Sequence, residues 1–177
     1  VKVSQLFEFP MSVGPKFRGS SLAVALGAFL VLMLSTAFSL SVEEAKLPGL
    51  VINGLVFLIL LVGFGYCGLG RPRAVIVSGD GIRVLLGKES KLVASSSDIE
   101  SVESRTLNSV LRVNGVGGFM GSWGTHQSKE LSSFEGYLTR ADHYVVITKK
   151  SGKSVVVTPD EPQALIEECR KLLPAQG

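Results

Sequence analysis

Residues 50–62 read LVINGLVFLILLV and carry no charged side chain. They form the centre of a longer uncharged segment, residues 47–70. An α-helix rises about 1.5 Å per residue, so roughly 20 apolar residues cross a hydrocarbon core of about 30 Å. Because the uncharged segment exceeds this length, it predicts a membrane-spanning helix over about residues 48–69.

A similar uncharged segment comes earlier in the chain, at residues 19–42. A cleaved signal peptide has an apolar core of only about 7 to 15 residues, so this segment favours a second spanning helix, over about residues 20–42. The short connection between the two segments contains Glu43, Glu44 and Lys46. The sequence therefore predicts a transmembrane helical hairpin within residues 19–70.

The composition agrees with a membrane protein and excludes several other classes. The chain has 177 residues, of which 46% are hydrophobic and 19% are charged. Lys and Arg number 18 against 15 Asp and Glu, and this small excess of cations does not predict nucleic acid as a partner. Cys67 and Cys169 are too few for a disulfide framework or a four-cysteine zinc site.

The cations beside the two segments predict the orientation of the hairpin. Short loops rich in Lys and Arg stay on the cytoplasmic side of a membrane. Cations both precede and follow the hairpin, whereas the connection holds only one: Lys2, Lys16 and Arg18 come before, Lys46 lies between, and Arg71 and Arg73 come after. We therefore expect a multi-pass cell-membrane protein with a cytoplasmic N-terminal segment, residues 1–18, and a cytoplasmic C-terminus.

Polar side chains within the two predicted spans favour packing over transport. Asn53 lies in one span, and Ser35, Thr36 and Ser39 lie in the other. Such side chains commonly form hydrogen bonds between paired helices, each contributing about 0.6 kcal/mol. Neither span contains Asp, Glu, Lys, Arg or His, which argues against an ion pump built from this chain alone. The glycines of residues 63–70 make the exit of the hairpin narrow and easily bent, which suits close helix approach or a flexible joint to the next domain.

After Arg73 the pattern changes to short β-branched segments separated by turn residues. Gly79-Asp80-Gly81 between two apolar runs predicts a β-hairpin, and about six or seven short strands fit the region as a whole. The segment after Pro159 has apolar residues at helical spacing, with Asp160 as a candidate N-cap. This order predicts an α+β domain of antiparallel strands closed by one C-terminal amphipathic helix.

Two blocks of the sequence make a family resemblance specific. Residues 115–124 read GVGGFMGSWG, and residues 155–162 read VVVTPDEP. These blocks resemble the glycine and aromatic block and the closing strand and helix of the prokaryotic pleckstrin-homology-like (bacterial PH) family. The resemblance covers residues 74–173, although His126 stands where an aromatic residue is expected. It implies a PH-like antiparallel β barrel or sandwich capped by one helix, and it implies no activity.

Two groups of residues are candidate binding sites. Phe119, Trp123 and His126 are candidates for a partner-binding loop, because aromatic side chains beside flexible glycines form good contact surfaces. The alternative is that the glycines permit a kinked strand and the aromatic residues cover one end of the barrel. A basic turn, Lys149, Lys150 and Lys153, is a candidate contact for anionic lipid, and a solvated turn is the alternative.

The motifs of enzymes and cofactor proteins are not found in this sequence. Met120 occupies the position of the third glycine in a dinucleotide-binding pattern, and no P-loop is present. Neither His126 nor His143 has further ligands at metal-binding spacing. We therefore expect no catalytic residue, no metal and no cofactor.

The preferred hypothesis is a non-enzymatic integral membrane protein whose PH-like domain binds another protein or a peptide at the membrane. Confinement to the bilayer raises the effective concentration of the domain toward membrane partners. The alternative is that the hairpin is a small subunit of a transport, export or envelope-assembly complex, with the domain docking or regulating it. Self-association is compatible with both hypotheses.

Overall fold

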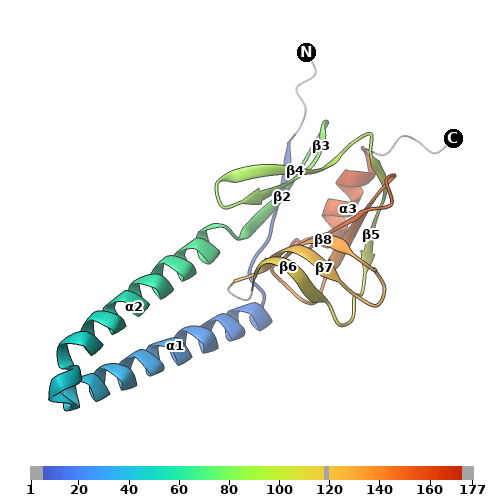
Figure 1. Ribbon diagram of the computed structural model, residues 1–177. Helices are drawn as coiled ribbons and strands as arrows, with labels where there is room; N and C mark the ends of the chain where they lie inside the picture. Colours follow the sequence, from blue (N-terminus) through green and yellow to red (C-terminus); the bar gives the residue numbers. More distant parts are fainter. Residues whose placement is uncertain (1–5, 118–119, 173–177) are drawn as a thin grey trace.

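The computed structural model describes residues 6–117 and 120–172, and shows two long helices extending from one end of a β-rich domain (Figure 1). Helix α1 (Pro15–Ser41) and helix α2 (Lys46–Leu69) are joined by a single 3₁₀ turn, η1 (Glu43–Ala45). Both helices are long and apolar enough to cross a membrane. They converge at η1 and separate toward the domain (Figure 1).

Polar contacts join the two helices, as the sequence predicts. The Ser35 hydroxyl donates a hydrogen bond of 2.9 Å to Oδ1 of Asn53, and Nδ2 of Asn53 donates one of 3.3 Å to Oγ1 of Thr36. Closer to η1, Gly49 lies directly beside the Ser39 side chain. The absence of a Cβ at Gly49 therefore allows the helices to approach each other at this end.

The domain contains two sheets and one short helix. The first sheet has the strand order β1-β2-β3-β4, and the second has the order β5-β9-β10-β8-β7-β6. The strands are β1 (Phe7–Pro10), β2 (Pro72–Ser78), β3 (Gly81–Leu86), β4 (Glu89–Ser95), β5 (Ile99–Arg105), β6 (Leu111–Gly117), β7 (Ser122–Gln127), β8 (Phe134–Leu138), β9 (Tyr144–Lys149) and β10 (Ser154–Val157). Helix α3 (Pro162–Arg170) follows β10. The predicted two-part fold class is confirmed, with more strands than the sequence indicates.

One strand pair differs from the antiparallel expectation. Strand β10 pairs with β8 in parallel, with Ser154 opposite Phe134 and Val157 opposite Tyr137. The β9–β10 hairpin causes this arrangement, because β10 lies between β8 and β9 in the sheet. The connection from β8 to β9 passes the end of β10, where the Thr139 backbone N–H donates a 2.8 Å hydrogen bond to Oγ1 of Thr158.

Strand β1 has no counterpart among the predicted elements. It pairs antiparallel with β2, placing Phe7 opposite Val77 and Phe9 opposite Val75. Phe9 and Met11 are buried in the main core. The domain is therefore built from segments on both sides of the hairpin, and both ends of the hairpin are attached to one sheet.

The connection from α2 to the domain, where the glycines suggest close helix approach or a flexible joint, is short and hydrogen-bonded. Helix α2 continues through its glycines to Leu69. The Gly70 N–H donates a 3.0 Å hydrogen bond to the Tyr66 carbonyl, and β2 begins at Pro72. Backbone hydrogen bonds hold this segment in place.

Apolar residues from both sheets and from α3 form the main core. Leu165 and Cys169 of α3 are fully buried, and burial raises the pKa of the Cys169 thiol to about 12. Asp160 is not the N-cap of α3, because α3 begins at Pro162 and the N-cap position is Glu161. A smaller apolar cluster, which includes Phe134, lies outside this main core.

Candidate functional site

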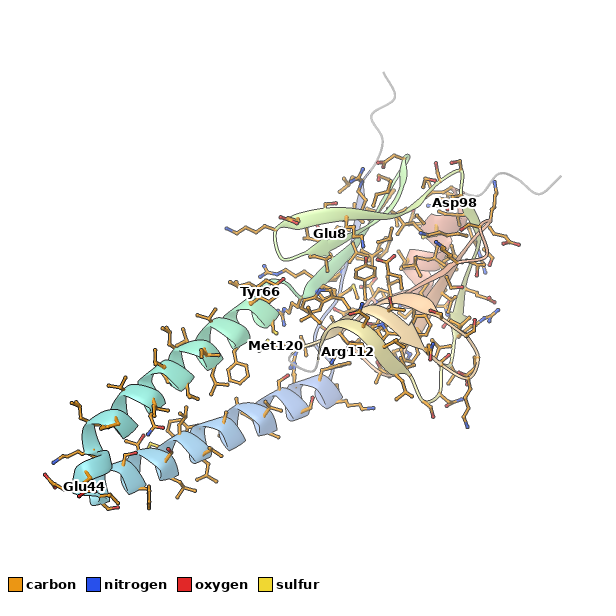
Figure 2. All side chains as sticks on the ribbon, viewed as in Figure 1. Glu8, Glu44, Tyr66, Asp98, Arg112 and Met120 are labelled. Atoms are coloured by element: carbon orange, nitrogen blue, oxygen red, sulfur yellow. The ribbon has the colours of Figure 1, made fainter. Side chains whose placement is uncertain are left out.

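Met120, just before β7, brings the domain into contact with α1 and with the segment that follows α2. The Met120 backbone N–H donates a 2.8 Å hydrogen bond to Oγ of Ser21 on α1. Nη1 of Arg71, just after α2, lies 3.7 Å from the Met120 sulfur. Figure 2 shows Met120 between the domain-facing ends of the two helices. We refer to this part of the molecule as the helix-proximal end of the domain.

A cavity of about 520 Å³ opens beside the first turn of α1. Residues from α1, from the β5–β6 connection and from β6 to β9 line it: Lys16, Phe17, Leu107, Asn108, Ser109, Val110, Arg112, Ser122, His126, Leu138, Arg140, Ala141 and Tyr144. We call this space the α1 cavity. Its apolar residues continue into the smaller apolar cluster, which includes Leu107, Leu138 and Tyr144.

Three cationic side chains, and no carboxylate, line the α1 cavity within the described chain. Arg140 is held by Asp142 at 2.8 Å and by Asp160 at 3.2 Å. The hydrogen bond from Arg140 lowers the pKa of Asp142 to about 2. Lys16 and Arg112 form no ion pair with any described residue. Two of the three cations in the lining are therefore without an ion pair in the described chain, although the Glu130 carboxylate lies nearby and accepts hydrogen bonds from Asn108.

A buried pair of polar side chains, Ser122 and His126, contributes to the lining of this cavity. Oγ of Ser122 lies 2.7 Å from Nε2 of His126, and Nδ1 of His126 lies 3.0 Å from the Gly124 carbonyl oxygen. A carbonyl only accepts, so Nδ1 carries the proton and Nε2 accepts from the Ser122 hydroxyl. Burial lowers the pKa of His126, and the charge of Arg112 lowers it further, against the opposing effect of the Gly124 carbonyl.

The surrounding sheet determines the position of the His126 ring. The ring stacks on Phe134 with 5.7 Å between centroids. Gly136 provides the space for the ring, because a Cβ at that position would lie 2.5 Å from Nδ1. The imidazole is thus fixed by one aromatic ring, one hydroxyl and one carbonyl. Nδ1 faces a main-chain carbonyl and not a carboxylate, so this pair does not form a Ser-His-Asp triad.

Comparison with known families identifies the family to which this domain belongs. A family model described as the bacterial PH domain matches residues 73–173, which is more than half of the chain. The chain belongs to the bacterial PH domain family. No curated protein and no solved structure matches it. The family resemblance of the two sequence blocks is thereby confirmed.

The first hairpin of this bacterial PH domain, β2–β3, carries little free positive charge. Asp80 accepts hydrogen bonds of 2.5 Å from Ser78 and 2.8 Å from Arg83. These bonds lower the pKa of Asp80. The charge of Arg83 is therefore paired with that of Asp80 within the hairpin. Lys16 and Arg112, which form no ion pair with a described residue, lie at the α1 cavity.

The structure separates the three residues of the predicted partner-binding loop. Phe119 lies outside the described residues. Trp123 is half-buried on β7 and packs against the main core. His126 is only 1% exposed, so the expectation that it contacts a partner directly is corrected. Its ring lies against the sheet because Gly136 has no Cβ to fill that space.

Trp123 also borders a second cavity, of about 560 Å³, where α2 meets the domain. Tyr66, Gly70, Arg73 and Lys88 lie in its lining. A Cβ built on Gly70 would lie 3.4 Å from Cζ2 of Trp123, so the indole packs closely on the end of α2. The contact supports the attachment of the helix to the bacterial PH domain.

The basic turn of Lys149, Lys150 and Lys153 lies far from the helices. The Lys150 N–H donates to the Asp98 carbonyl at 2.8 Å, and its Nζ donates to the Ser97 carbonyl at 2.7 Å. Figure 2 shows Asp98 at the end of the domain opposite the helices. This placement, at the end of the domain away from α1 and α2, argues against the expected lipid contact.

Sequence reasoning missed most of the α1 cavity. In the sequence, Lys16 indicates only the orientation of the hairpin, and Arg112, Ser122 and Arg140 belong to no motif. Tertiary structure brings these residues together from α1, β6, β7 and the end of β8. One signal was available, because Ser122, Gly124 and His126 alternate along the chain and so share one face of a strand. Among the described residues, no group of three or more His, Cys, Asp or Glu side chains could hold a metal ion.

Proposed function

We propose that this bacterial PH protein is a non-enzymatic, multi-pass membrane protein whose domain lies in the cytoplasm and binds another protein or a peptide beside the bilayer. The cations that flank the hairpin on the domain side support this orientation. The pairing of β1 with β2 supports a common side for both ends of the hairpin, because these strands adjoin α1 and α2.

Rigid attachment gives the domain a fixed orientation at the membrane. The Gly14 N–H donates a 2.8 Å hydrogen bond to the Thr139 carbonyl just before α1 begins. After α2, only Gly70 and Arg71 precede β2. A domain held in this way presents the same surface to every membrane partner, and tethering raises its effective concentration there.

The free edge of β6 is the single observation that carries the binding proposal. Strand β6 ends the six-stranded sheet and, among the described strands, pairs only with β7. Two of its side chains, Leu111 and Val113, are 67% and 58% exposed. An open strand edge with exposed apolar side chains accepts an extended peptide segment through main-chain hydrogen bonds.

The test is capture of partners by the tagged full chain in native membranes. We expect the double substitution Leu111→Asp with Val113→Asp to abolish partner recovery, because charges on an edge strand oppose strand addition. Leu92→Asp is the matched control, since Leu92 is an exposed apolar residue on the edge strand β4 of the other sheet. Equal thermal unfolding midpoints for the three proteins would show that the fold is retained.

Recovery of the same partners by the double variant would contradict the β6 proposal. Those partners would then be assigned to the hairpin, as in the alternative function of a small subunit in a membrane complex. Point substitutions make this distinction better than deletion of residues 74–173. That deletion would also remove the strand with which β1 pairs.

A further inference from the structure

The α1 cavity has features that its packing role does not explain. It has a volume of about 520 Å³ and lies beside the smaller apolar cluster, not within the main core. Its lining combines cations and hydroxyl and amide groups with the apolar side chains of Phe17, Leu107 and Val110. A space of this kind suits a ligand with a compact anionic group and an adjoining apolar part.

We propose that the α1 cavity binds the phosphate of an anionic phospholipid headgroup. Lys16 and Arg112 supply positive charge, and neither forms an ion pair with a described carboxylate. Arg140 adds a guanidinium whose position is fixed by Asp142 and Asp160. Arg and Lys recognise phosphate by charge-assisted hydrogen bonds, and Arg does so with two parallel bonds.

The position of the cavity favours a lipid as the source of the phosphate. Lys16 and Phe17 belong to the first turn of α1, and the uncharged segment of this helix starts at Gly19. A helix that crosses the bilayer places its first charged turn at the level of the lipid phosphates. The cavity then opens where headgroups are concentrated, and Phe17 lies beside their acyl chains.

The buried Ser122–His126 pair provides a reporter at the site. The charge of Arg112 is among the causes that lower the pKa of His126. An anion bound beside Arg112 offsets that charge, so the imidazole becomes easier to protonate. Occupancy of the cavity is therefore measurable at the His126 ring itself.

The experiment uses the full chain in a neutral detergent and three probes. Dihexanoyl phosphatidylglycerol is the anionic lipid, dihexanoyl phosphatidylcholine is the matched zwitterionic lipid, and glycerol 3-phosphate is the soluble phosphate. Binding is followed by calorimetry and by the pH titration of the ¹⁵N-labelled His126 ring. We expect saturable binding of phosphatidylglycerol in preference to the other two probes, together with a raised pKa of His126.

Matched variants connect this binding to the cavity. Lys16→Gln with Arg112→Gln should weaken phosphatidylglycerol binding at least about tenfold, because each cation near an anionic headgroup contributes substantially. The conservative change Arg112→Lys should retain much of the binding. Lys150→Gln with Lys153→Gln removes equal charge at the opposite end of the domain and should change nothing.

Three results would overturn the proposal. Equal binding of phosphatidylglycerol by the cavity variant and the wild type would show that the α1 cavity is not the phosphate site. Equal or stronger binding of glycerol 3-phosphate would assign the phosphate to a soluble source. Displacement of the lipid by an acidic peptide at lower concentration than by lipid itself would assign the cavity to a peptide. Each outcome is separate from the β6 test, which uses Leu111 and Val113.

Discussion

The Ser12 hydroxyl donates a hydrogen bond of 2.6 Å to Oδ1 of Asp160. The Ser12 backbone N–H also lies 3.1 Å from each oxygen of that carboxylate. This contact joins the segment that enters α1 to the connection between β10 and α3. The N-terminal segment is therefore a structural part of the bacterial PH domain, although the family match begins at residue 73.

The first prediction is that residues 72–172 alone fold poorly. Phe9, Met11 and Val13 are buried, and each contributes about 1.5 to 3 kcal/mol. Their combined loss is comparable with the total stability of a domain. Urea unfolding of residues 72–172 should therefore show a much lower midpoint than a fusion in which a Gly/Ser linker replaces residues 15–71.

Asp160→Ala provides the control for this prediction. In the fusion it should lower the free energy of unfolding by about 1 to 3 kcal/mol, because the Ser12 hydroxyl, the Ser12 N–H and the Arg140 guanidinium all lose an acceptor. A smaller loss is expected in the fusion that also carries Ser12→Ala, since the two residues share one interaction. Equal midpoints for the fusion and for residues 72–172 would show that β1 is dispensable.

The second prediction concerns pH. The folded pKa of His126 is lowered, so the unfolded chain binds more protons below its ordinary value of about 6.5. The contribution of His126 to stability is therefore present above that pH and is lost as pH falls through the folded pKa. The free energy of unfolding of the fusion should fall between pH 7 and 5, by up to about 1.4 kcal/mol per pH unit.

Replacing each histidine in turn identifies which one causes this slope. His126→Gln should flatten the profile between pH 7 and 5, whatever it does to absolute stability. His143→Gln is the matched control, because the His143 side chain lies on the surface. A slope that persists in His126→Gln would contradict the assignment.

The third prediction concerns the glycine block. Gly115 and Gly124 are opposite each other in β6 and β7, with φ of +115° and +128°. A Cβ on either would press on main-chain atoms of the partner strand. Gly124→Ala should therefore destabilise the fusion by about 1 to 3 kcal/mol, measured by urea unfolding. The exposed neighbour Thr125→Ala should stay within about 0.5 kcal/mol, and an equal effect of the two changes would argue against the steric explanation.

Local signals in the sequence explain which parts of the fold could be predicted. The two apolar segments and the Gly79–Gly81 turn are contiguous features, and the structure has the helices and the β2–β3 hairpin there. Strand β1 has only four residues and ends at Pro10, so it lacks a strand signal of its own. It exists because β2, on the other side of the hairpin, provides its partner. Strands β6 and β7 were missed because glycine has a low β propensity.

The residues of the candidate site come together almost entirely through tertiary structure. Lys16 and Arg112 belong to different elements and meet at the α1 cavity only after the β6–β7 turn docks beside α1. Trp123 is a candidate contact residue from the sequence alone, but its contact with Gly70 is a long-range one. The three lysines of the basic turn are close together in the sequence. The direction of the strands then carries that cluster to the end of the domain away from the helices.

The central claim, a cytoplasmic domain fixed to a membrane hairpin, is tested most directly by cysteine accessibility in intact cells. Cys67 and Cys169 are first replaced by serine and alanine, and single cysteines are then placed at Glu8, Glu44 and Gly152. We predict that an impermeant maleimide labels only Glu44→Cys, which lies at the turn between the helices (Figure 2). Labelling of Glu8→Cys and Gly152→Cys with protection of Glu44→Cys would contradict the account, because the domain would then lie outside the cell.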